Sequence, residues 1–455
     1  MDLSIATNGL LTSQIGIETT GNNIANANTS GYNRQVVLQV EGAPTLVTVA
    51  GSPPIEGVGN GAEVSAIQRQ HDQLLDVNFR QQSALQAGLQ LRSDTLTQAE
   101  QAAGATGSAS LDNALGSFFA AFQTLAGNPE NAATRAQAVA QAQGLTTTFN
   151  QQDQQLAALQ TQLDQGLQPQ IAQVNQFAQQ IAGLNQHILQ AGPGGSNALL
   201  DQRDSLLDQV ASLTGARVTM MSDGTADVAI GTTTLVDGTS AHSLVGTAGG
   251  NGFTQVTPAG SSAPVALGGQ MGAAVTLRDQ DLAGLRSQLN GLAATLAQQV
   301  NTLQQGGFTL GGAAGPPLFT GTTAGTLAVN AAVSNDPSQL AAAATAAGVP
   351  GDGNNALAIA QVGQALVMNG GTATLQDAYQ ADTAQLAVAT QAATQGVQNQ
   401  NAVVQMLTQQ RQSTSGVNLD QEAASLLQYQ RSYEASARLL TTMDQMLQTL
   451  IDNTS

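Results

Sequence analysis

The sequence predicts a mainly α-helical protein with a small inserted β domain, whose first and last helices pair as a coiled coil. Three observations predict this fold. Apolar residues recur at heptad spacing at both ends of the chain, and helical periodicity runs nearly unbroken over residues 131–190. Residues 215–275 then change to short β-branched runs separated by turn signals. We therefore expect a bundle of long helices that carries a small outer antiparallel β domain.

The first segment, residues 1–35, carries the first heptad stripe. Its apolar positions recur every seventh residue and are Leu3, Leu10, Ile17 and Ile24. The stripe ends in a cluster of Asn, Thr, Ser and Gly residues between Asn22 and Gly31. These residue types stop helices and build turns because their side chains compete for backbone hydrogen bonds. We expect the turn to redirect the chain between layers, with Tyr32 and Arg34 contacting neighbouring subunits; a purely local helix stop is the alternative.

The next stretch, residues 36–61, is interpreted as an extended linker because it alternates apolar and polar residues and then becomes rich in Pro and Gly. Helical spacing returns from Val64 to about Ala103, and a short Phe-rich helix follows that ends at Gly127. Residues 62–214 are therefore assigned to a helical body, which also takes in residues 276–305 and 354–414.

Residues 131–190 form the longest predicted helix of this body. At 1.5 Å per residue it would extend roughly 90 Å. Gly166 and Pro169 are expected to kink it. The Pro-Gly-Gly run at 193–195 is expected to end it, and Ser196 to cap the next helix.

The sequence changes character at Gly215. Residues 215–275 are read as the β domain, and residues 306–353 as a Gly/Pro-rich segment with one strand at 326–329. Between and after them, helices are expected at residues 277–305, 354–368 and 375–412.

The last segment, residues 415–455, carries the second stripe. Asn418 is a good N-cap, Gln421 suits a capping box, and Asp420 and Glu422 suit the positive end of the helix dipole. The heptad positions are Leu419, Leu426, Tyr433, Leu440 and Leu447, and they are interleaved with Tyr429, Met443 and Leu450.

Neither stripe can bury itself alone, which suggests an association surface. We hypothesise that the N-terminal stripe packs against the four positions from Leu426 to Leu447 in an assembly, and that the termini are mobile before assembly because short unpacked helices are marginal. Leu426→Asp and Leu440→Asp would then disrupt assembly, since each places a desolvated charge on the seam. Helices of an ordinary bundle also look like this over two or three turns, but the persistence of the tail pattern to Leu450 favours association.

Composition excludes several classes of function. Charged residues are only 9% of the 455, the net charge is −18, and all 12 basic residues are Arg, scattered singly. Binding to nucleic acid or to an anionic membrane surface is therefore disfavoured. There is no Cys, which excludes disulfides and thiolate metal sites, and neither a signal peptide nor an apolar run of membrane-spanning length is recognisable. We expect no membrane insertion.

Residues that could carry chemistry are sparse. His71, His187 and His242 lie in unrelated segments without metal-ligand spacing, and the Gly-rich run at 57–61 lacks the Lys of a phosphate-binding loop. Asp201 and Asp204 could be the paired carboxylates of an enzyme, but together with Arg203 a salt bridge between helices or subunits is favoured. We expect no enzyme activity, no cofactor and no metal.

Four blocks carry a family resemblance. The stretch from 23 to 35 resembles the N-terminal signature shared by the axial proteins of the bacterial flagellum, which are rod, hook and hook-associated proteins. The blocks 57–80, 197–204 and 415–438 resemble the hook-associated members that join hook to filament. The motif residues of the turn between layers are Asn23, Asn26, Asn28, Gly31, Tyr32 and Arg34.

The resemblance implies a structural subunit of the hook-filament junction, in which the terminal helices line an inner layer around a central channel and the β insert faces outwards. It implies export by the flagellar type III apparatus to an extracellular position, after a transient cytoplasmic stage. The implied partners are copies of the chain in a ring or tube, hook protein, an adjacent hook-associated protein, the filament, and a cytosolic export chaperone. Candidate chaperone-binding residues are Leu426, Tyr429, Leu440, Met443 and Leu447.

The β region is compact, so an outer domain found in longer relatives is expected to be missing. Two alternatives remain. One is another flagellar axial role, of the hook or rod type, which the C-terminal block and the Leu-Asp-Gln-Arg-Asp sequence at 200–204 disfavour. The other, more remote, is an unrelated secreted coiled-coil scaffold or adhesin.

Overall fold

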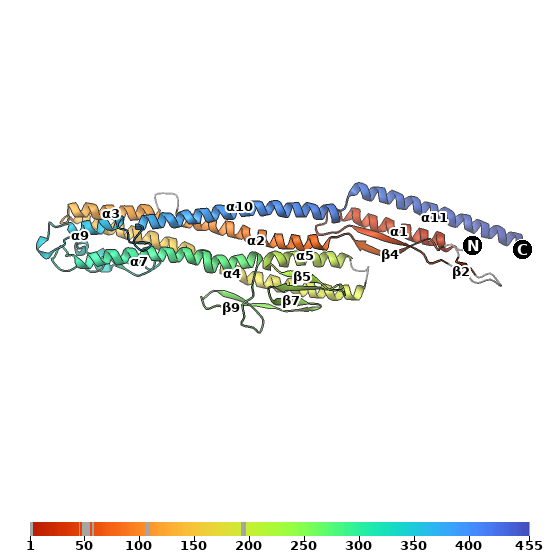
Figure 1. Cartoon of the computed structure of the whole chain (residues 1–455), viewed down its shortest axis with the longest axis horizontal. Coiled ribbons are helices and arrows are strands. Elements are labelled where there is room, and N and C mark those ends of the chain that lie inside the picture. The colour runs from red at the N-terminus through yellow and green to blue at the C-terminus, as the bar shows by residue number, and fades with distance from the viewer. Residues whose placement is uncertain are drawn as a thin grey trace.

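The computed structural model describes residues 3–44, 46–47, 55–56, 59–104, 110–192 and 197–454. The molecule is elongated, with both chain ends at one extremity (Figure 1). A body of long helices fills most of its length, and a β domain lies against one side of that body. The sequence-based expectations for Pro193–Ser196 fall outside the described residues.

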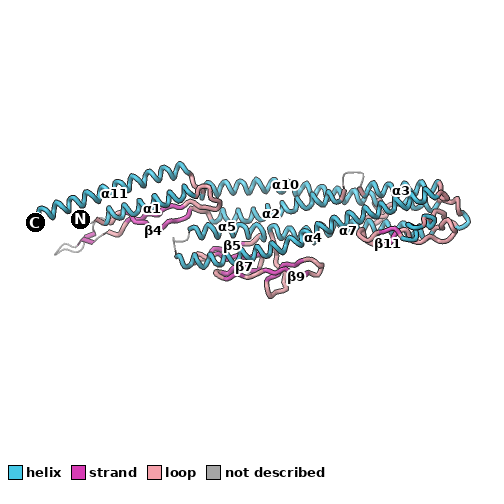
Figure 2. The backbone as a smooth tube through the Cα atoms, turned by 180° about the vertical axis from the view of Figure 1, so that it is seen from behind, coloured by secondary structure: helices cyan, strands magenta, loops and turns pink. Residues whose placement is uncertain are grey.

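The body is built from four long helices that lie side by side (Figures 1 and 2). They are α2 (Gln73–Ala102), α4 (Ala132–Ala191), α7 (Leu282–Gly306) and α10 (Leu375–Ser415). The shorter helices α3 (Leu111–Gly127) and α9 (Asn354–Gln361) cover the end far from the chain termini. Fully buried aromatic rings fill the core at this end, namely Phe118, Phe122, Phe149 and Phe319.

Helix α4 has 60 residues and is continuous through Gly166 and Pro169. Its start is set by Asn131, whose side chain accepts hydrogen bonds from the backbone N–H groups of Ala133 and Thr134 at 2.8 and 3.4 Å. One half of the helix packs in the distal core and the other half packs against the β domain. This helix therefore ties the two cores together.

The β domain follows α5 (Asn197–Thr214) and contains a four-stranded antiparallel sheet whose strands lie in sequence order. A hairpin of two further strands completes it. The sheet strands are β5 (Arg217–Met220), β6 (Ala226–Ile230), β7 (Thr233–Asp237) and β8 (Ser240–Ala241); the hairpin strands are β9 (Leu244–Ala248) and β10 (Thr254–Pro258). Apolar side chains of the strands, such as Val228 and Leu235, pack in one cluster with those of α4 and α5.

Two boundaries beyond the β domain differ from expectation. Helix α6 (Gly269–Thr276) begins within the predicted β domain and runs through a π-helical turn, η1 (Leu277–Asp281), into α7. The helix expected to reach residue 368 ends at Gln361 in a 3-10 turn, η4 (Val362–Gln364). The Gly/Pro-rich segment holds β11 (Phe319–Thr320), β12 (Ala328–Val329), α8 (Ala331–Asn335), and the 3-10 turns η2 (Pro337–Gln339) and η3 (Ala346–Gly348).

The two chain ends form one structural unit, here called the terminal unit, which comprises the described residues of 3–69 and 416–454. Its helices α1 (Ser4–Ala25) and α11 (Leu419–Thr454) pack against each other, and the strands β1 (Gln35–Glu41) and β4 (Ala62–Arg69) form an antiparallel pair beside α1. The short strands β2 (Leu46–Val47) and β3 (Ile55–Glu56) pair beyond them. The predicted fold class, with paired terminal helices, is confirmed.

The expectation of a helix from Val64 was wrong, because residues 62–69 form the strand β4, which pairs with the extended segment β1. Half-buried Val64 and Ala66 alternate with exposed Glu63 and Ser65, which is the period of a strand rather than of a helix. Helix α2 begins only after Asp72, whose carboxylate accepts hydrogen bonds from the next backbone N–H groups of the helix.

Candidate functional site

The contact between α1 and α11 is centred on small residues. Gly9, Gly16 and Asn23 recur every seventh residue on α1, and they face Ser436, Tyr429 and Glu422 of α11 in antiparallel order. A Cβ atom added at Gly9 would lie 2.6 Å from Ser436 Oγ, and one added at Gly16 would lie 2.5 Å from the Tyr429 ring. The two helices can therefore approach this closely only because these positions are glycine.

A buried polar network fixes one end of this contact. Glu422 is 1% exposed, and its carboxylate accepts hydrogen bonds from Arg34 Nε at 2.6 Å and from Asn23 Nδ2 at 3.0 Å. Asn23 also exchanges two bonds with the backbone of Gln35, through its Nδ2 and its Oδ1. Where a helix-helix contact contains one group of buried polar side chains, these side chains can bond to each other in only one register of the two helices. This network therefore aligns α1 with α11.

The turn after α1 is folded around the same network. The Tyr32 hydroxyl donates to Asn23 Oδ1 at 2.7 Å, and burial together with the carboxylates of Asp201 and Glu422 raises the pKa of Tyr32 to about 12. Asn26 bonds back to Asn22, Gly31 adopts a φ of +81°, and Asn28 is exposed. Tyr32 and Arg34, which we expected to contact neighbouring subunits, are bonded here to groups of their own chain.

The predicted heptad stripes flank this line of small residues. Half-buried members are Leu10, Ile17, Leu426, Leu440 and Leu447, together with the interleaved Tyr429 and Met443. The exposed members are Leu3 at 37%, Ile24 at 36%, Leu419 at 53% and Tyr433 at 41%. Further apolar side chains of the pair are 40–59% exposed, namely Leu11, Leu427, Leu439, Met446, the interleaved Leu450, and Ile451. The pairing of α1 with α11 therefore leaves much apolar surface uncovered.

A ladder of ion pairs lies where the terminal unit meets the body. Asp201, Asp204 and Asp208 follow one face of α5. Arg69 of β4 bonds to the first two of these carboxylates, each at 2.8 Å. The second is shared with Arg80 of α2, which also bonds Asp208, and Arg411 of α10 bonds Asp208 and Asp76. Asn33 Nδ2 donates to Asp201 Oδ1 at 2.6 Å.

The ion pairs of this ladder give a structural role to Asp201 and Asp204, the two carboxylates that could have been the paired acids of an enzyme. Burial alone would lower the pKa of Arg69, but the bonded Asp204 and Asp201 reverse the direction and raise it, so the guanidinium stays charged. Arg203 takes no part and turns to Asn185 Oδ1 at 3.0 Å and to the Gly224 carbonyl at 2.6 Å, which anchors the β domain. The partners Arg69, Arg80 and Arg411 could not have been assigned from the sequence, because they lie on three elements, β4, α2 and α10, that are far from α5 in the chain. The i, i+3, i+7 spacing of the aspartates, in contrast, indicates from the sequence that they share one helix face.

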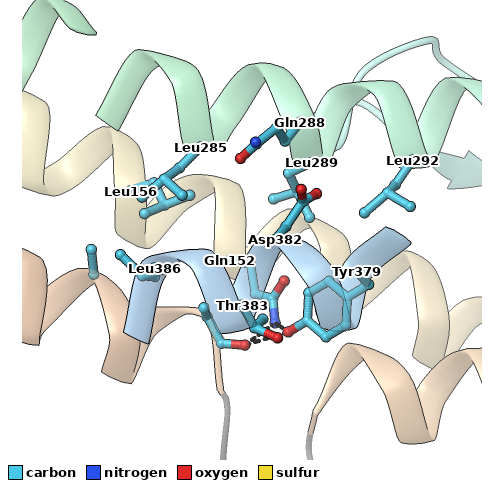
Figure 3. Close-up of a pocket in the computed structure, with 12 residues that line it drawn as sticks. Gln152, Leu156, Leu285, Gln288, Leu289, Leu292, Tyr379, Asp382, Thr383 and Leu386 are labelled. Carbon is cyan, nitrogen blue, oxygen red and sulfur yellow. Dashed lines mark hydrogen bonds between the residues drawn. The ribbon is translucent and has the colours of Figure 1, made fainter. Parts of the chain in front are cut away.

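One small cavity in the distal body has apolar walls (Figure 3). It measures about 40 Å³ and lies between α4, α7 and α10. At its edge Gln152 and Tyr379 both donate to the Ala103 carbonyl, and burial raises the pKa of Asp382. No nucleophile paired with a base lines this cavity among the residues described.

The described ranges hold little else that could carry chemistry. No cluster of three or more His, Cys, Asp or Glu residues there could hold a metal ion, and His71, His187 and His242 are all exposed. Within the same ranges, no helix has the length and apolar character needed to cross a membrane.

Three protein-family models match the chain. The flagellar hook-associated protein FlgK helical domain matches residues 96–319. The flagella basal body rod protein model matches residues 3–33, and the flagellar basal body rod FlgEFG protein C-terminal model matches residues 408–453. The two terminal matches fall on α1 and α11, which are the helices that pair.

Full-length relatives agree with these matches. Flagellar hook-associated protein 1 of Escherichia coli K12 is 28% identical over 98% of each chain, and that of Bacillus subtilis 168 is 26% identical over 99% of this chain and 98% of its own. The Salmonella typhimurium LT2 protein of the same name is 32% identical over 69% of this chain and 58% of its own. The alignment with the E. coli protein spans 545 positions, more than this chain holds, so that relative has segments without a counterpart here.

A solved structure shares the fold. The flagellar hook junction protein FlgK from Burkholderia pseudomallei superposes with a TM-score of 0.65 and covers 76% of this chain and 100% of its own, at 19% identity.

Proposed function

The chain belongs to the family of flagellar hook-associated protein 1 and has a structural role in the flagellar axis, and from this premise we propose that it forms the junction between hook and filament. The family is a structural one, and we further propose that the chain carries no catalytic activity. Its partners in this role are further copies of itself, hook protein, an adjacent hook-associated protein and the filament. The alternatives, a hook or rod role, share only the terminal segments matched by the rod models.

The observation that supports this role is the uncovered apolar surface of the paired terminal helices. The pair is aligned by Gly9, Gly16 and the Glu422 network, while leucines on its flanks stay exposed, Leu419 at 53% and Leu427 at 56%. Burying such side chains is favourable by roughly 25 cal/mol per Å² of apolar surface. Copies that bury these flanks in a head-to-tail arrangement would form a ring or tube.

Deletion of the gene tests the place of the protein in the flagellum. We expect bare hooks, with flagellin lost to the medium, because nothing would join the filament to the hook. Missing hooks would assign the chain to the rod or hook instead, and normal filaments would contradict any axial role.

Substitution of Leu419 and Leu427 by Gln tests the surface itself. Both side chains are exposed, and Gln has a helix propensity similar to that of Leu, so the free subunit should remain folded. A strain carrying this variant should release flagellin as the deletion does. The matched control is Val388→Gln, which removes an apolar side chain that is even more exposed, at 66%, from α10 of the body. Normal filaments from the Leu419/Leu427 variant would contradict the proposed surface.

The half-buried seam residues test the pairing. Leu426→Asp and Leu440→Asp would put charges on the flank that packs towards α1, and desolvating an unpaired charge is costly. We expect both junction formation and the pairing of the terminal helices to be weakened. Normal chaperone affinity and normal filaments would count against the assigned seam.

We propose, in addition, export by the flagellar type III apparatus after a cytoplasmic stage in which a chaperone covers α11. The candidate chaperone residues include Tyr429, whose ring lies against Gly16, so the chaperone must displace α1. The chain has no Cys, so Gly9→Cys with Ser436→Cys gives a single possible disulfide. A Cβ atom added at Gly9 would lie 3.4 Å from the Ser436 Cβ atom, at the short end of the separations found in disulfides.

The oxidised double-cysteine chain should fail to bind the chaperone, and reduction should restore binding. Equal chaperone affinity of the oxidised and reduced chains would contradict the assignment. Formation of the disulfide in the free subunit also tests the expectation of mobile termini, which limited proteolysis can check independently.

A further inference from the structure

The joint between the terminal unit and the body is polar. Neither of the two large apolar clusters of the described chain includes a residue from the terminal unit. The bonds that cross from this unit to α5 are those of Asn33 and Arg69 with Asp201, of Arg69 with Asp204, and of Asn197 Nδ2 with the Ile67 carbonyl at 2.9 Å. The orientation of the terminal unit on the body therefore depends on a few directional bonds, and three of these meet at Asp201, two from Asn33 and one from Arg69.

Two consecutive residues connect this joint to the terminal helix pair. Arg34 bonds to Glu422 of α11 at 2.6 Å, and Asn33 bonds to Asp201 of α5 at 2.6 Å. The backbone between them is also held, because the Arg34 N–H donates to the Ser415 carbonyl and the Arg34 carbonyl accepts from the Gln70 N–H, both at 2.8 Å. A shift of Arg34 would therefore be passed directly to Asn33.

Tyr32 supplies a second link. Its hydroxyl donates to Asn23, which itself bonds Glu422, and the carboxylates of both Asp201 and Glu422 raise the pKa of this hydroxyl. The two carboxylates, one on α5 and one on α11, thus act on the same side chain. The turn of residues 32–34 lies between them.

We propose that residues 32–34 couple the pairing of the terminal helices to the orientation of the terminal unit on the body. When α11 docks on α1, Glu422 fixes Asn23 and Arg34, and the fixed turn places Asn33 on Asp201. When α11 leaves, Arg34 loses its buried partner Glu422, and the turn no longer holds Asn33 in position to bond Asp201. The coupling is a property of the single subunit and goes beyond the proposed place in the flagellum.

Coupling of this kind is reciprocal. Loss of the Asp201 bonds should weaken the docking of α11, although Asp201 does not touch α11 through any bond described. Loss of Glu422 should loosen the joint, although Glu422 lies within the terminal unit. Both effects act at a distance, so independent local contacts would produce neither.

Spin labels on the full chain test this, since the absence of native Cys leaves only introduced labelling sites. One label replaces Ser65 of β4 and the other Val388 of α10, both exposed. Their distance distribution, measured by pulsed electron resonance, reports the orientation of the terminal unit on the body. Hydrogen exchange of the α11 amides in the same samples reports docking.

The variants are Glu422→Gln, Asp201→Asn and the two combined. We expect each single variant to broaden the distance distribution and to speed exchange in α11, and the double variant to do little more than either. The matched control is Asp153→Asn, which breaks a comparable ion pair with Arg286, at 2.8 Å, within the distal body. It should leave both readouts as in the unmodified chain.

Three results would overturn the proposal: a narrow distribution in Glu422→Gln, additive effects in the double variant, or a control that broadens as much. Asn33→Ala tests the proposal even if the charge variants misfold, because it leaves both carboxylates and their arginines in place. It should broaden the distribution, and added Glu422→Gln should then have little further effect on orientation. A large further effect would show that Glu422 does not act through this turn.

Discussion

The body and the terminal unit are stabilised in different ways. In the body, large side chains such as Phe118, Phe122 and Phe149 are at most 1% exposed and fill a dense core. In the terminal unit, α1 and α11 meet through glycines, and Glu422 is the one buried residue among the described side chains of α11.

This difference shows which part of the chain buries its apolar side chains within the single subunit. The body buries a core of aromatic and aliphatic side chains within the single chain, and such burial is the main source of its stability. A pair of helices aligned by small residues, with leucines left exposed on its flanks, leaves apolar surface uncovered in the single chain. The proposed function therefore assigns stability and assembly to separate regions, and substitutions can distinguish them.

The largest expected effect is in the body. Phe118→Ala would remove a fully buried ring that packs against Phe119, Phe122 and Phe319 at 5.0 to 5.7 Å between centroids. We expect a loss of about 3–5 kcal/mol in the free energy of unfolding, measured by denaturant titration of the full chain. Tyr429→Ala removes a ring from the terminal pair and should leave that main transition nearly unchanged. Equal losses would mean that the two regions unfold as one.

The next effect concerns the close approach of the terminal helices. Gly16→Ala would place a Cβ atom 2.5 Å from the Tyr429 ring, and overpacking of this kind costs about 1–3 kcal/mol. A Cβ atom added at Gly21 on the same helix would have no neighbouring atom within 4 Å. Gly21→Ala should therefore stabilise α1 by up to about 1 kcal/mol. Hydrogen exchange of α11 amides should become faster in the first variant and not in the second. The same response from both would refute the small-residue contact.

That contact also shows how far the sequence could predict the fold. Helix starts marked by local chemistry, at Asn131 and Asn418, were predictable because the capping side chain lies within three residues of the amides it binds. The heptad stripes correctly predicted that the terminal helices pair. They did not predict the contact line, because the leucines are the larger apolar residues whereas the glycines allow the close approach.

Other features depended on distant parts of the chain. The segment from Val64 was misread as helix because its apolar residues continue into those of α2, and only pairing with β1 selects the strand. Arg69, Arg80 and Arg411 are isolated in the sequence, so their meeting at the α5 aspartates follows from the tertiary fold alone. Asn23 and Arg34 stand in a recognisable motif, yet their common partner Glu422 lies about 400 residues away.

A third prediction applies one chemical change to both regions. Asn131→Ala and Asn418→Ala each remove a helix cap, which is worth about 1 kcal/mol. In α4 the loss should lower the free energy of global unfolding, because that helix runs through both cores. In α11 it should appear only as faster amide exchange in the first turns. A global effect from Asn418→Ala would show that the terminal unit contributes to the stability of the body.

The smallest expected effect depends on pH and compares half-buried Tyr32 with buried Tyr379. In the terminal unit the pKa of Tyr32 is raised to about 12, from a reference of 10.0, by burial and by the carboxylates of Asp201 and Glu422. In the body, burial raises the pKa of Tyr379, whose hydroxyl donates to the Ala103 carbonyl. A group whose pKa is raised on folding stabilises the fold fully below its unfolded pKa and loses that contribution as the pH rises through the folded value. Each tyrosine should therefore weaken its own region only above about pH 10.

Spectrophotometric titration of tyrosinate in the unmodified chain and in Tyr32→Phe gives the Tyr32 curve by difference. We expect its midpoint near 12 and, over the same pH range, faster exchange in the α11 amides of the unmodified chain than in the Phe variant. Tyr379→Phe is the matched variant for the body and should change the alkaline behaviour of that region alone. A Tyr32 midpoint near 10 would show that its hydroxyl is neither desolvated nor close to the carboxylates of Asp201 and Glu422, and the turn would then be an ordinary exposed loop with no means of sensing whether α11 is docked.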